Sequence, residues 1–379
     1  MRRIALLALA LGVGVPHMAA AQSSLYGVVG LGFPGRPIGV RARGMGGSLG
    51  AVDPGSAVNP APVAQLTRLA ATVTSLTSLR DYRIDTVAVD GLQDTRFPFA
   101  SLAGGITGTP LSFEASYANY LSRTWDITSS DTVVLRGQPV GVEDRIRSDG
   151  AVADLRGALG WYVSSKLQIG GAFHLITGST RERIQRQYSD RAYTPLLHDS
   201  DIGYTGFGWS VGLASSPVSG LRLGVSFRSD GALKAARDSV LIGRVDLPMT
   251  VSGGFAASPL AGILLASTVT WQSWSDAQEG LTSIGGDATT FDTWDVSAGL
   301  EIGGGVGPPV PIRLGFRYAQ LPFSPGDDQV REIDLTAGTG FNFAQGRAAF
   351  TFAVERVSRD GGGASERAWQ LAFGLSLLP

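Results

Sequence analysis

The amino-acid sequence predicts an all-β protein, a transmembrane antiparallel β-barrel of about fourteen strands. Apolar and polar residues alternate along successive runs from residue 69 onward, which is the period of a strand with two different faces. The connections between these runs alternate between short turns and long polar segments. Before the first run, residues 41–66 are rich in glycine, alanine and proline and show neither a strand period nor a helix period.

The chain begins with the features of a cleaved export signal. Arg2 and Arg3 form a basic start, residues 4–15 are apolar, and residues 19–21 provide a small-residue cleavage site. We therefore expect residues 1–21 to be a signal peptide. The alternative is an N-terminal membrane anchor, which the short apolar run disfavours because a spanning helix needs about 20 residues.

Composition narrows the classes of function. The net charge is −1 and only 17% of the residues are charged, so no charge excess points to nucleic acid or to an anionic surface. The chain has 52 glycines and no cysteine. The absence of cysteine excludes disulfides and thiolate metal sites.

The alternating runs define the expected barrel, over residues 69–379. In "AWQLAFGLSLL", for example, Trp, Leu and Phe alternate with Gln, Ala, Gly and Ser. Such a thin polar face suits a barrel lumen with lipid on the other side, whereas a soluble sandwich or propeller, the alternative, exposes a charged face. We expect strands at residues 69–83, 97–107, 111–124, 150–163, 167–181, 203–215, 221–230, 247–257, 262–275, 293–303, 311–320, 331–343, 347–357 and 367–378.

The connections indicate how the barrel is wired. Outer-membrane barrels have short turns at the periplasmic end and long loops at the external end. Tryptophans near the expected strand ends fit the aromatic girdles of such barrels, namely Trp125, Trp161, Trp271, Trp274 and Trp294. The short turns lie at 108–110, 164–166, 215–220, 258–261, 304–310 and 344–346, and the long loops at 84–96, 125–149, 182–202, 231–246 and 276–292.

Charged residues on the polar faces are expected in the lumen. Both signs occur, so pairing across strands or against a plug is favoured over an ion-selectivity ring, which needs one sign to dominate. These residues are Glu114, Asp154, Arg156, Arg222, Arg228, Asp295, Glu301, Arg313, Arg317, Glu332, Asp334, Arg347 and Glu355.

No motif predicts an enzyme, a cofactor or a metal site. "GLGFPG" at residues 30–35 matches the dinucleotide-binding pattern, but its prolines and the glycines that follow prevent the required helix. His174 lies on the expected lumen face, where it does not meet a lipid substrate. His198 stands in "HDSD", beside Asp199 and Asp201, where a solvated loop is favoured over a cation site.

Two of the expected long loops carry apolar clusters. Exposed apolar clusters are costly unless they pack on each other or on a ligand. They are therefore candidate entry residues for a hydrophobic ligand, with packing between loops as the alternative. The clusters are Tyr193, Leu196 and Leu197 in one loop, and Val240, Leu241 and Ile242 in the next.

The segment "ARGMGGSLGAVDPGSAVNPAPVAQL" resembles the N-terminal segment of the FadL-type long-chain fatty-acid and hydrocarbon transporters and of the related PorV-type proteins. The resemblance rests on the small-residue run 43–50, the acidic turn that begins at Asp53, and the tripeptide Asn59, Pro60 and Ala61. It implies that residues 22–68 are a hatch, or plug, that closes the lumen.

The resemblance also implies an external groove between the third and fourth long loops and an opening in the barrel wall. The family's opening needs a kinked strand, and residues 111–124 contain no Gly or Pro. Gly104, Gly105 and Gly108 in the preceding run are the candidates for a bulge instead. Two further departures are the ending Leu378-Pro379, in place of a terminal aromatic residue, and the short chain.

Two functions are favoured at this stage over a third, a polar porin, which would need a wide lumen that a hatch segment argues against. The first is a monomeric bacterial outer-membrane channel for passive uptake of small hydrophobic compounds, such as fatty acids or hydrocarbons, with membrane lipid and the ligand as its partners. The second is a PorV-like barrel that serves as a docking or shuttle component for secreted proteins and transports no small molecule. A continuous apolar tunnel supports the first, and a lumen filled by the hatch and charge pairs supports the second.

Overall fold

The wall of the molecule is one closed antiparallel sheet, which has fourteen strands within the part of the chain that the structure describes. The structure, a computed structural model, describes residues 24–84, 87–286, 288–303 and 310–377. The predicted fold class is confirmed. The wall strands are β2 (Ala70–Ile84), β3 (Val87–Gly105), β4 (Leu111–Ser122), β6 (Gln138–Ser164), β7 (Leu167–Tyr188), β8 (Leu196–Ser215), β9 (Leu221–Asp230), β12 (Met249–Leu260), β13 (Ile263–Gln272), β15 (Thr293–Ile302), β16 (Ile312–Gln320), β18 (Arg331–Phe343), β19 (Ala348–Gly361) and β20 (Ala364–Leu377).

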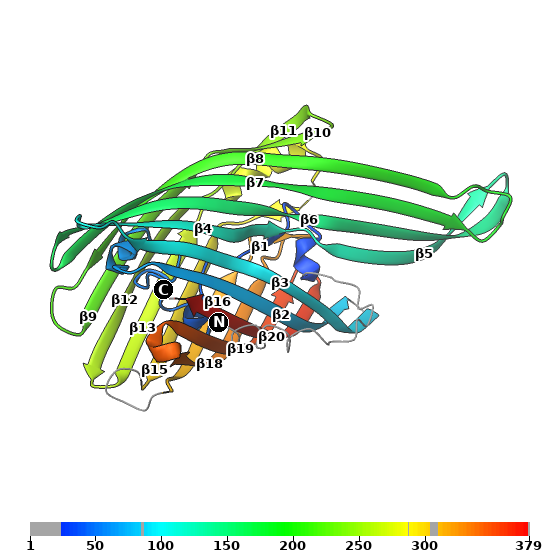
Figure 1. Cartoon of the computed structure of the whole chain (residues 1–379). Coiled ribbons are helices and arrows are strands. Elements are labelled where there is room, and N and C mark those ends of the chain that lie inside the picture. The colour runs from blue at the N-terminus through cyan, green and yellow to red at the C-terminus, as the bar shows by residue number, and fades with distance from the viewer. Residues whose placement is uncertain (1–23, 85–86, 287, 304–309, 378–379) are drawn as a thin grey trace, which may run out of the picture.

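Each wall strand pairs with the wall strands before and after it in the chain (Figure 1). The last strand, β20, closes the barrel by pairing with β2 along its length, from Ala71 opposite Leu377 to Ile84 opposite Ala364. Closure pairs the wall strands on both sides, apart from one stretch between β3 and β4, and a sheet needs paired edges to stand in lipid.

The outer face of the barrel is apolar. In β20, Trp369, Phe373 and Leu375 are exposed, whereas Gln370 and Ala372 face inward and are buried. This is the alternation that the sequence shows, with the apolar side turned outward. Every wall strand except β19 contributes at least one exposed large apolar residue.

The predicted aromatic girdle is only partly correct. Trp161 and Trp294 are exposed on the outer face. Trp271 is half-buried, and Trp125 and Trp274 are buried. Trp125 begins a strand of the extension described next and Trp274 begins the helix η3 (Trp274–Ala277), so both belong to structure beyond the wall strands rather than to a membrane surface.

Three of the predicted long loops are instead strands. β2 extends to Ile84 and β3 begins at Val87, and residues 125–149 and 182–202 belong for the most part to β5 (Trp125–Leu135), β6, β7 and β8. These four strands extend far past the rest of the barrel (Figure 1). Their sequence is polar on both faces, so it lacks the alternation by which a half-buried strand is found.

The part of this extension at residues 125–148 and 180–202 is called the projecting sheet here. Its strands are joined by side-chain pairs between arginine and aspartate on neighbouring strands. Each arginine donates two hydrogen bonds, one from Nε and one from a terminal nitrogen, to the two oxygens of one carboxylate. This bidentate geometry fixes the orientation of the pair. The pairs are Arg145 with Asp126, Arg186 with Asp144, Arg183 with Asp199, and Arg181 with Asp201.

A cap covers the end of the barrel from which the projecting sheet extends, and this end is called the capped end. It consists of the hairpin β10 (Ala232–Arg237) and β11 (Val240–Asp246), the helices η3 (Trp274–Ala277) and α2 (Gln278–Ser283), and the short pair β14 (Thr289–Thr290) and β17 (Phe323–Ser324). Leu233, Val245, Trp274, Leu281 and Phe323 form its apolar core. In the described part of the chain the other end carries short turns, including η4 (Ala344–Gly346), and it is called the short-turn end.

The N-terminal segment, residues 24–69, lies inside the barrel and contains η1 (Leu25–Gly27), β1 (Phe33–Pro34), α1 (Val40–Arg43) and η2 (Ala61–Gln65). It begins at the capped end, where the Ser24 hydroxyl donates to Glu366 of β20. It leaves at the short-turn end, where Ser112 of β4 donates to the Leu66 carbonyl over 3.0 Å.

Glycines on the inner faces of the wall strands make room for this segment. A Cβ on Gly224 of β9 would overlap the Ala51 carbonyl, and a Cβ on Gly315 of β16 would overlap the backbone of Met45. The glycines of the thin polar faces are therefore positions where the N-terminal backbone rests directly on the wall.

Three predictions fall outside the described residues. They concern the signal peptide at residues 1–21, most of the connection at 304–310, and the ending Leu378-Pro379. Among the described residues, no helix is both long enough and apolar enough to cross a membrane.

Candidate functional site

The lumen contains a dense network of ion pairs, as predicted. Arg317 of β16 contacts Asp295 of β15 and both Glu332 and Asp334 of β18, the two neighbouring strands. Arg359 of β19 bridges Glu332 and Glu366. Further pairs inside the barrel are Arg156 with Glu114, Arg313 with Glu301, and Arg228 with Asp154.

Two of the predicted lumen charges are not in such pairs. Arg222 is half-buried and lies near Asp53, Arg41 and Glu301. Arg347 is exposed just after η4, so its placement in the lumen was wrong. It lies in the turn between β18 and β19, where strand alternation no longer fixes the direction of a side chain.

The N-terminal segment joins this network through three arginines. Arg36 pairs with Glu355 at 3.0 Å, and Arg43 pairs with the same carboxylate at 3.2 Å. Arg41 contacts Glu301 at 2.8 Å and Asp53 at 3.4 Å. Charge pairing therefore holds the segment to β15 and β19.

The predicted hatch motif is buried against the inner wall. The Asn59 amide donates to the Ala51 carbonyl at 2.8 Å and to the Leu213 carbonyl of β8 at 3.1 Å. Its side-chain oxygen accepts from the Ala61 amide at 3.0 Å. Asn59 thus closes a turn of the segment and fastens that turn to the barrel.

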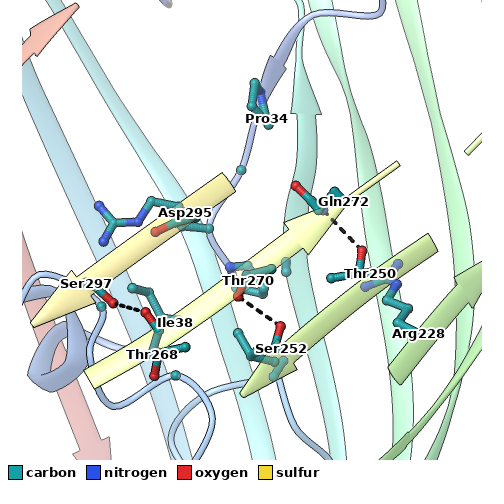
Figure 2. A pocket seen from close by; sticks show the side chains of 18 of the residues that line it. Pro34, Ile38, Arg228, Thr250, Ser252, Thr268, Thr270, Gln272, Asp295 and Ser297 are labelled. Carbon is teal, nitrogen blue, oxygen red and sulfur yellow. Dashed lines mark hydrogen bonds between the residues drawn. The ribbon is translucent and has the colours of Figure 1, made fainter. Parts of the chain in front are cut away.

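A cavity of about 150 Å³ lies between the N-terminal segment and the inner faces of β12, β13 and β15. It is called the hydroxyl cavity here. Figure 2 shows Pro34 and Ile38 on the segment side and polar side chains on the wall side. The wall side chains are Thr250, Ser252, Thr268, Thr270, Gln272 and Ser297.

The wall side of the hydroxyl cavity is preorganised by hydrogen bonds between strands. Ser252 and Thr270 are linked at 2.9 Å, and Gln272 donates to Thr250 at 3.2 Å (Figure 2). Ser297 donates to the Thr268 carbonyl at 3.2 Å. The described lumen therefore presents a polar compartment closed by the segment, and not a continuous apolar tunnel.

A series of buried, hydrogen-bonded polar groups lies beside the hydroxyl cavity, and only part of it was predicted from the sequence. His174 of β7 faces the lumen, as predicted, and its Nδ1 lies 2.9 Å from Asp154 while its Nε2 lies 3.0 Å from the Ser210 hydroxyl. Because a carboxylate only accepts, Nδ1 donates to Asp154, and neutral Nε2 accepts from Ser210. Asp154 also accepts from Arg228 at 2.7 Å.

This Ser210–His174–Asp154 order matches that of a hydrolytic triad, but the surroundings do not. Ser210 is 3% exposed and His174 0%, and neither lines a cavity. The chain instead fixes Asp154 and Arg228, which do line the hydroxyl cavity. No sequence motif marks Ser210, because the three residues meet only through the register of β6, β7 and β8.

The predicted "HDSD" cluster is part of the projecting sheet. Asp199 and Asp201 each pair with an arginine of β7, and His198 lies opposite Ile184. Among the described residues, no group of three or more His, Cys, Asp or Glu side chains is arranged to hold a metal ion.

The barrel wall is discontinuous between β3 and β4. Here β3 has one extra residue, because Phe97 and Pro98 stand opposite Ser75 of β2 alone. Beyond this bulge, β3 no longer pairs with β4. The vacated edge of β4 pairs instead with β1, Phe33 opposite Ser122 and Pro34 opposite Leu121. This place is called the seam.

The glycines that were candidates for a wall opening lie elsewhere. Gly104 and Gly105 are in the regularly paired part of β3, opposite Phe113 and Ser112, and Gly108 is in the following turn. Gly104 and Gly105 admit the backbone of residues 66–69 as it leaves the lumen, whereas a Cβ at Gly108 would meet nothing within 4 Å.

The candidate entry residues form two separate groups. Leu196 and Leu197 begin β8, whereas β10 reaches along β8 only as far as Ile202. Five to six strand residues separate the groups, or about 20 Å. Tyr193 stacks on Tyr188 with ring centroids 5.5 Å apart.

Within the second group the residues differ. Val240 and Leu241 are exposed, and Ile242 packs against the apolar core of the cap. Val240, Leu241 and Ile242 therefore lie at the capped end of the barrel. The first group lies apart from them, at the projecting sheet.

Solved structures with the same architecture are known, although no family model and no curated protein matches the sequence. A FadL homologue of Pseudomonas aeruginosa superposes with a TM-score of 0.63 at 13% identity, over 91% of this chain and 99% of that chain. The Ralstonia pickettii toluene transporter TbuX gives 0.60 at 15%, over 90% and 98%. The CymD monoaromatic hydrocarbon channel gives 0.59 at 15%, over 90% and 97%. The chain has the FadL-type fold.

Proposed function

We propose that this FadL-type barrel lies in a bacterial outer membrane as a monomer and is a passive channel for small hydrophobic compounds, gated by its N-terminal segment. The apolar outer face supports the membrane location, because a soluble barrel would turn charged residues outward. The resemblance in fold to hydrocarbon channels supports the class of ligand.

The observation that carries this proposal is the closure of the barrel by its own N-terminal segment. A porin has a wide aqueous bore, whereas here the segment fills the bore and leaves the hydroxyl cavity. A hydrophobic compound needs no aqueous bore, since its transfer from water to an apolar medium is favourable by itself. No nucleotide or metal is required.

The seam supplies the side exit in this proposal. Only the two residues of β1 replace β3 along the edge of β4 there. A short strand of two residues makes few hydrogen bonds, so its displacement costs little compared with opening a wall strand. The compound would enter the barrel at the capped end and leave through the seam into lipid.

A reversible disulfide tests this exit, because the chain has no cysteine of its own. Phe33 and Ser122 are directly opposed, so Phe33→Cys with Ser122→Cys places two thiols within bridging distance. We expect oxidation to abolish uptake of radiolabelled toluene and oleate by cells without other such channels, and reduction to restore it.

The matched control joins two strands of the permanent wall. Thr72 and Ser376 are opposed in β2 and β20, so Thr72→Cys with Ser376→Cys bridges a pair that never separates. Its oxidation leaves uptake unchanged. Uptake that continues through the oxidised Phe33–Ser122 variant would rule out the seam as the exit.

Deleting residues 41–66 tests the gate. If the segment closes the bore, the deletion raises single-channel conductance in planar bilayers. Equal conductance of the intact and deleted proteins, both shown to be folded by heat-dependent migration on gels, would contradict gating.

A second function is favoured by specific observations. The lumen is filled by the segment and by ion pairs, and the projecting sheet exposes both faces beyond the barrel. Both features fit a PorV-like docking component for secreted proteins. Removing residues 127–147 separates the two: it leaves uptake intact if the protein is a channel, and it stops release of secreted proteins if the sheet is a docking platform.

A further inference from the structure

Beside the seam, the lumen contains arginine side chains whose hydrogen-bonding capacity is unused. Arg80 of β2 is 2% exposed, and none of its three guanidinium nitrogens has an acceptor. The nearest carboxylate, Asp94, is 3.9 Å away. The Nε atoms of Arg96 and Arg43 are likewise buried without an acceptor.

Arg96 and Arg43 line a second cavity of about 80 Å³, called the arginine cavity here. Arg43 is 3% exposed and reaches it from α1, while Arg96 reaches it from β3. Phe33, Pro34 and Pro98 line the same cavity and also form the seam. Arg96 and Arg43 therefore stand directly inside the side exit, whereas Arg80 is not part of the cavity lining.

The carboxylates of this cavity are already occupied. Glu332 is held by Arg317 and Arg359, and Asp334 is held by Arg317 and Arg36. Asp295 is held by Arg317. Three other arginines, Arg80, Arg43 and Arg359, lie close enough to repel the charge of Arg96, and only one carboxylate, that of Asp94, attracts it.

A buried guanidinium N–H without an acceptor, such as the Nε atoms of Arg43 and Arg96, is unfavourable, so such an arrangement persists where a ligand supplies the missing oxygens. We propose that the arginine cavity is an oxyanion site that binds the carboxylate of a small organic acid. Arginine suits this ligand because its planar fork matches two carboxylate oxygens.

The cavity sizes set the rest of the ligand. The arginine cavity adjoins the hydroxyl cavity, and both share Pro34, Gly35, Arg36 and Asn119 in their linings. A cavity of about 150 Å³ accommodates one benzene ring. The ligand is thus an acid with one ring or a short chain, whose ring contacts hydroxyl groups, and not a long-chain acid or a bare hydrocarbon.

Passage of this acid through the barrel rests on the proposed function, but its binding does not. The experiment uses the full-length protein in phosphatidylcholine nanodiscs, with titration calorimetry and saturation-transfer NMR of benzoate and of its neutral isostere benzamide. We expect benzoate to bind and Arg96→Gln to weaken it about tenfold or more, since a hydrogen bond to a charged group is lost. Benzamide binding should be unchanged by this variant.

Arg145→Gln is the matched control, because this exposed arginine of the projecting sheet pairs with Asp126 far from the cavity. It leaves benzoate binding unchanged. Arg96→Gln removes a guanidinium group whose buried Nε has no acceptor, so the variant retains the fold, which heat-dependent migration on gels verifies.

Three results would overturn the proposal. The first is benzoate and benzamide weakening equally in Arg96→Gln, which assigns the arginine to packing alone. The second is binding of inorganic phosphate that benzoate does not displace, which makes the site one for free anions. The third is no binding of benzoate. Normal benzoate binding in a protein that transports neither toluene nor oleate keeps the site and rejects the channel.

Discussion

The side chain of Asn59 lies directly against Gly212 of β8, so that a Cβ at Gly212 would overlap the Asn59 amide oxygen. The same amide binds the carbonyl of Leu213, the next residue in the strand. One asparagine and one glycine thus join the centre of the N-terminal segment to the wall. The tripeptide Asn59-Pro60-Ala61 is thus held in place by a strand residue, Leu213, more than 150 positions further along the chain.

Replacing Gly212 by alanine is expected to displace Asn59 and loosen the segment, because the methyl group occupies the place of the amide. The displaced segment should become sensitive to added protease in nanodiscs, with a cleavage between residues 41 and 66. Gly157→Ala is the control, since a Cβ there meets nothing within 4 Å. Equal protease resistance of the two variants would contradict a fixed segment.

Replacing His174 by leucine is expected to destabilise the barrel by about 1–3 kcal/mol, because the buried Ser210 hydroxyl and the Asp154 carboxylate each lose a partner. Unfolding in urea, followed by tryptophan fluorescence, measures the loss. Ser210→Ala should cost less, since it removes a group without leaving a charge unpaired. Hydrolysis of p-nitrophenyl acetate by the wild-type protein that disappears in Ser210→Ala would show a catalytic triad and refute a purely structural role.

The projecting sheet is expected to lose order in acid. Side-chain hydrogen bonds from Arg145, Arg186, Arg183 and Arg181 lower the pKa of Asp126, Asp144, Asp199 and Asp201, respectively, below the ordinary value. A carboxyl with a lower pKa in the folded state stabilises that state above the unfolded pKa of about 4, and the contribution is lost as the pH falls through the folded value.

Pepsin should therefore cut within residues 125–148 and 180–202 near pH 2 but not near pH 4. The membrane strands serve as the internal control and stay uncut at both values. The same cleavage pattern at both pH values would show that the arginine–aspartate pairs do not hold the projecting sheet together.

Deleting Pro98 is expected to close the seam. The deletion leaves Phe97 alone opposite Ser75, which restores one-to-one pairing of β2 with β3 and lets β3 continue along β4. Uptake of toluene should fall by at least half, with the barrel still folded. Pro98→Ala keeps the extra residue and is the control, so equal uptake by the two variants would argue that the bulge has no part in the exit.

The sequence predicted those features that depend on the chain meeting lipid on one side. Trp369, Phe373 and Leu375 alternate with inward residues because the two faces of β20 meet different media. The same criterion failed for residues 125–149, where arginine and aspartate stand on a sheet with water on both sides. Strand pairing there rests on partners such as Arg186 and Asp144, which no local pattern marks.

The candidate site was less accessible to prediction. The sequence placed His174 and Asp154 in the lumen, but their contact with Ser210 depends on how three strands align. The seam depends on one extra residue in β3 relative to β2, which shows only when the two strands are paired. Arg80 and Arg96 were not singled out because their significance is a missing acceptor, which is a property of the packed lumen.

The bond between Ser24 and Glu366 joins residues 342 positions apart, and it lies inside a wall that closes only when β20 meets β2. The part of the chain made first is therefore enclosed by the part made last. Contacts of such long range form slowly, because the intervening chain must first lose its freedom. The wall strands therefore have to assemble around the N-terminal segment before β20 pairs with β2. After that pairing, the segment can enter or leave the bore only through one of its ends.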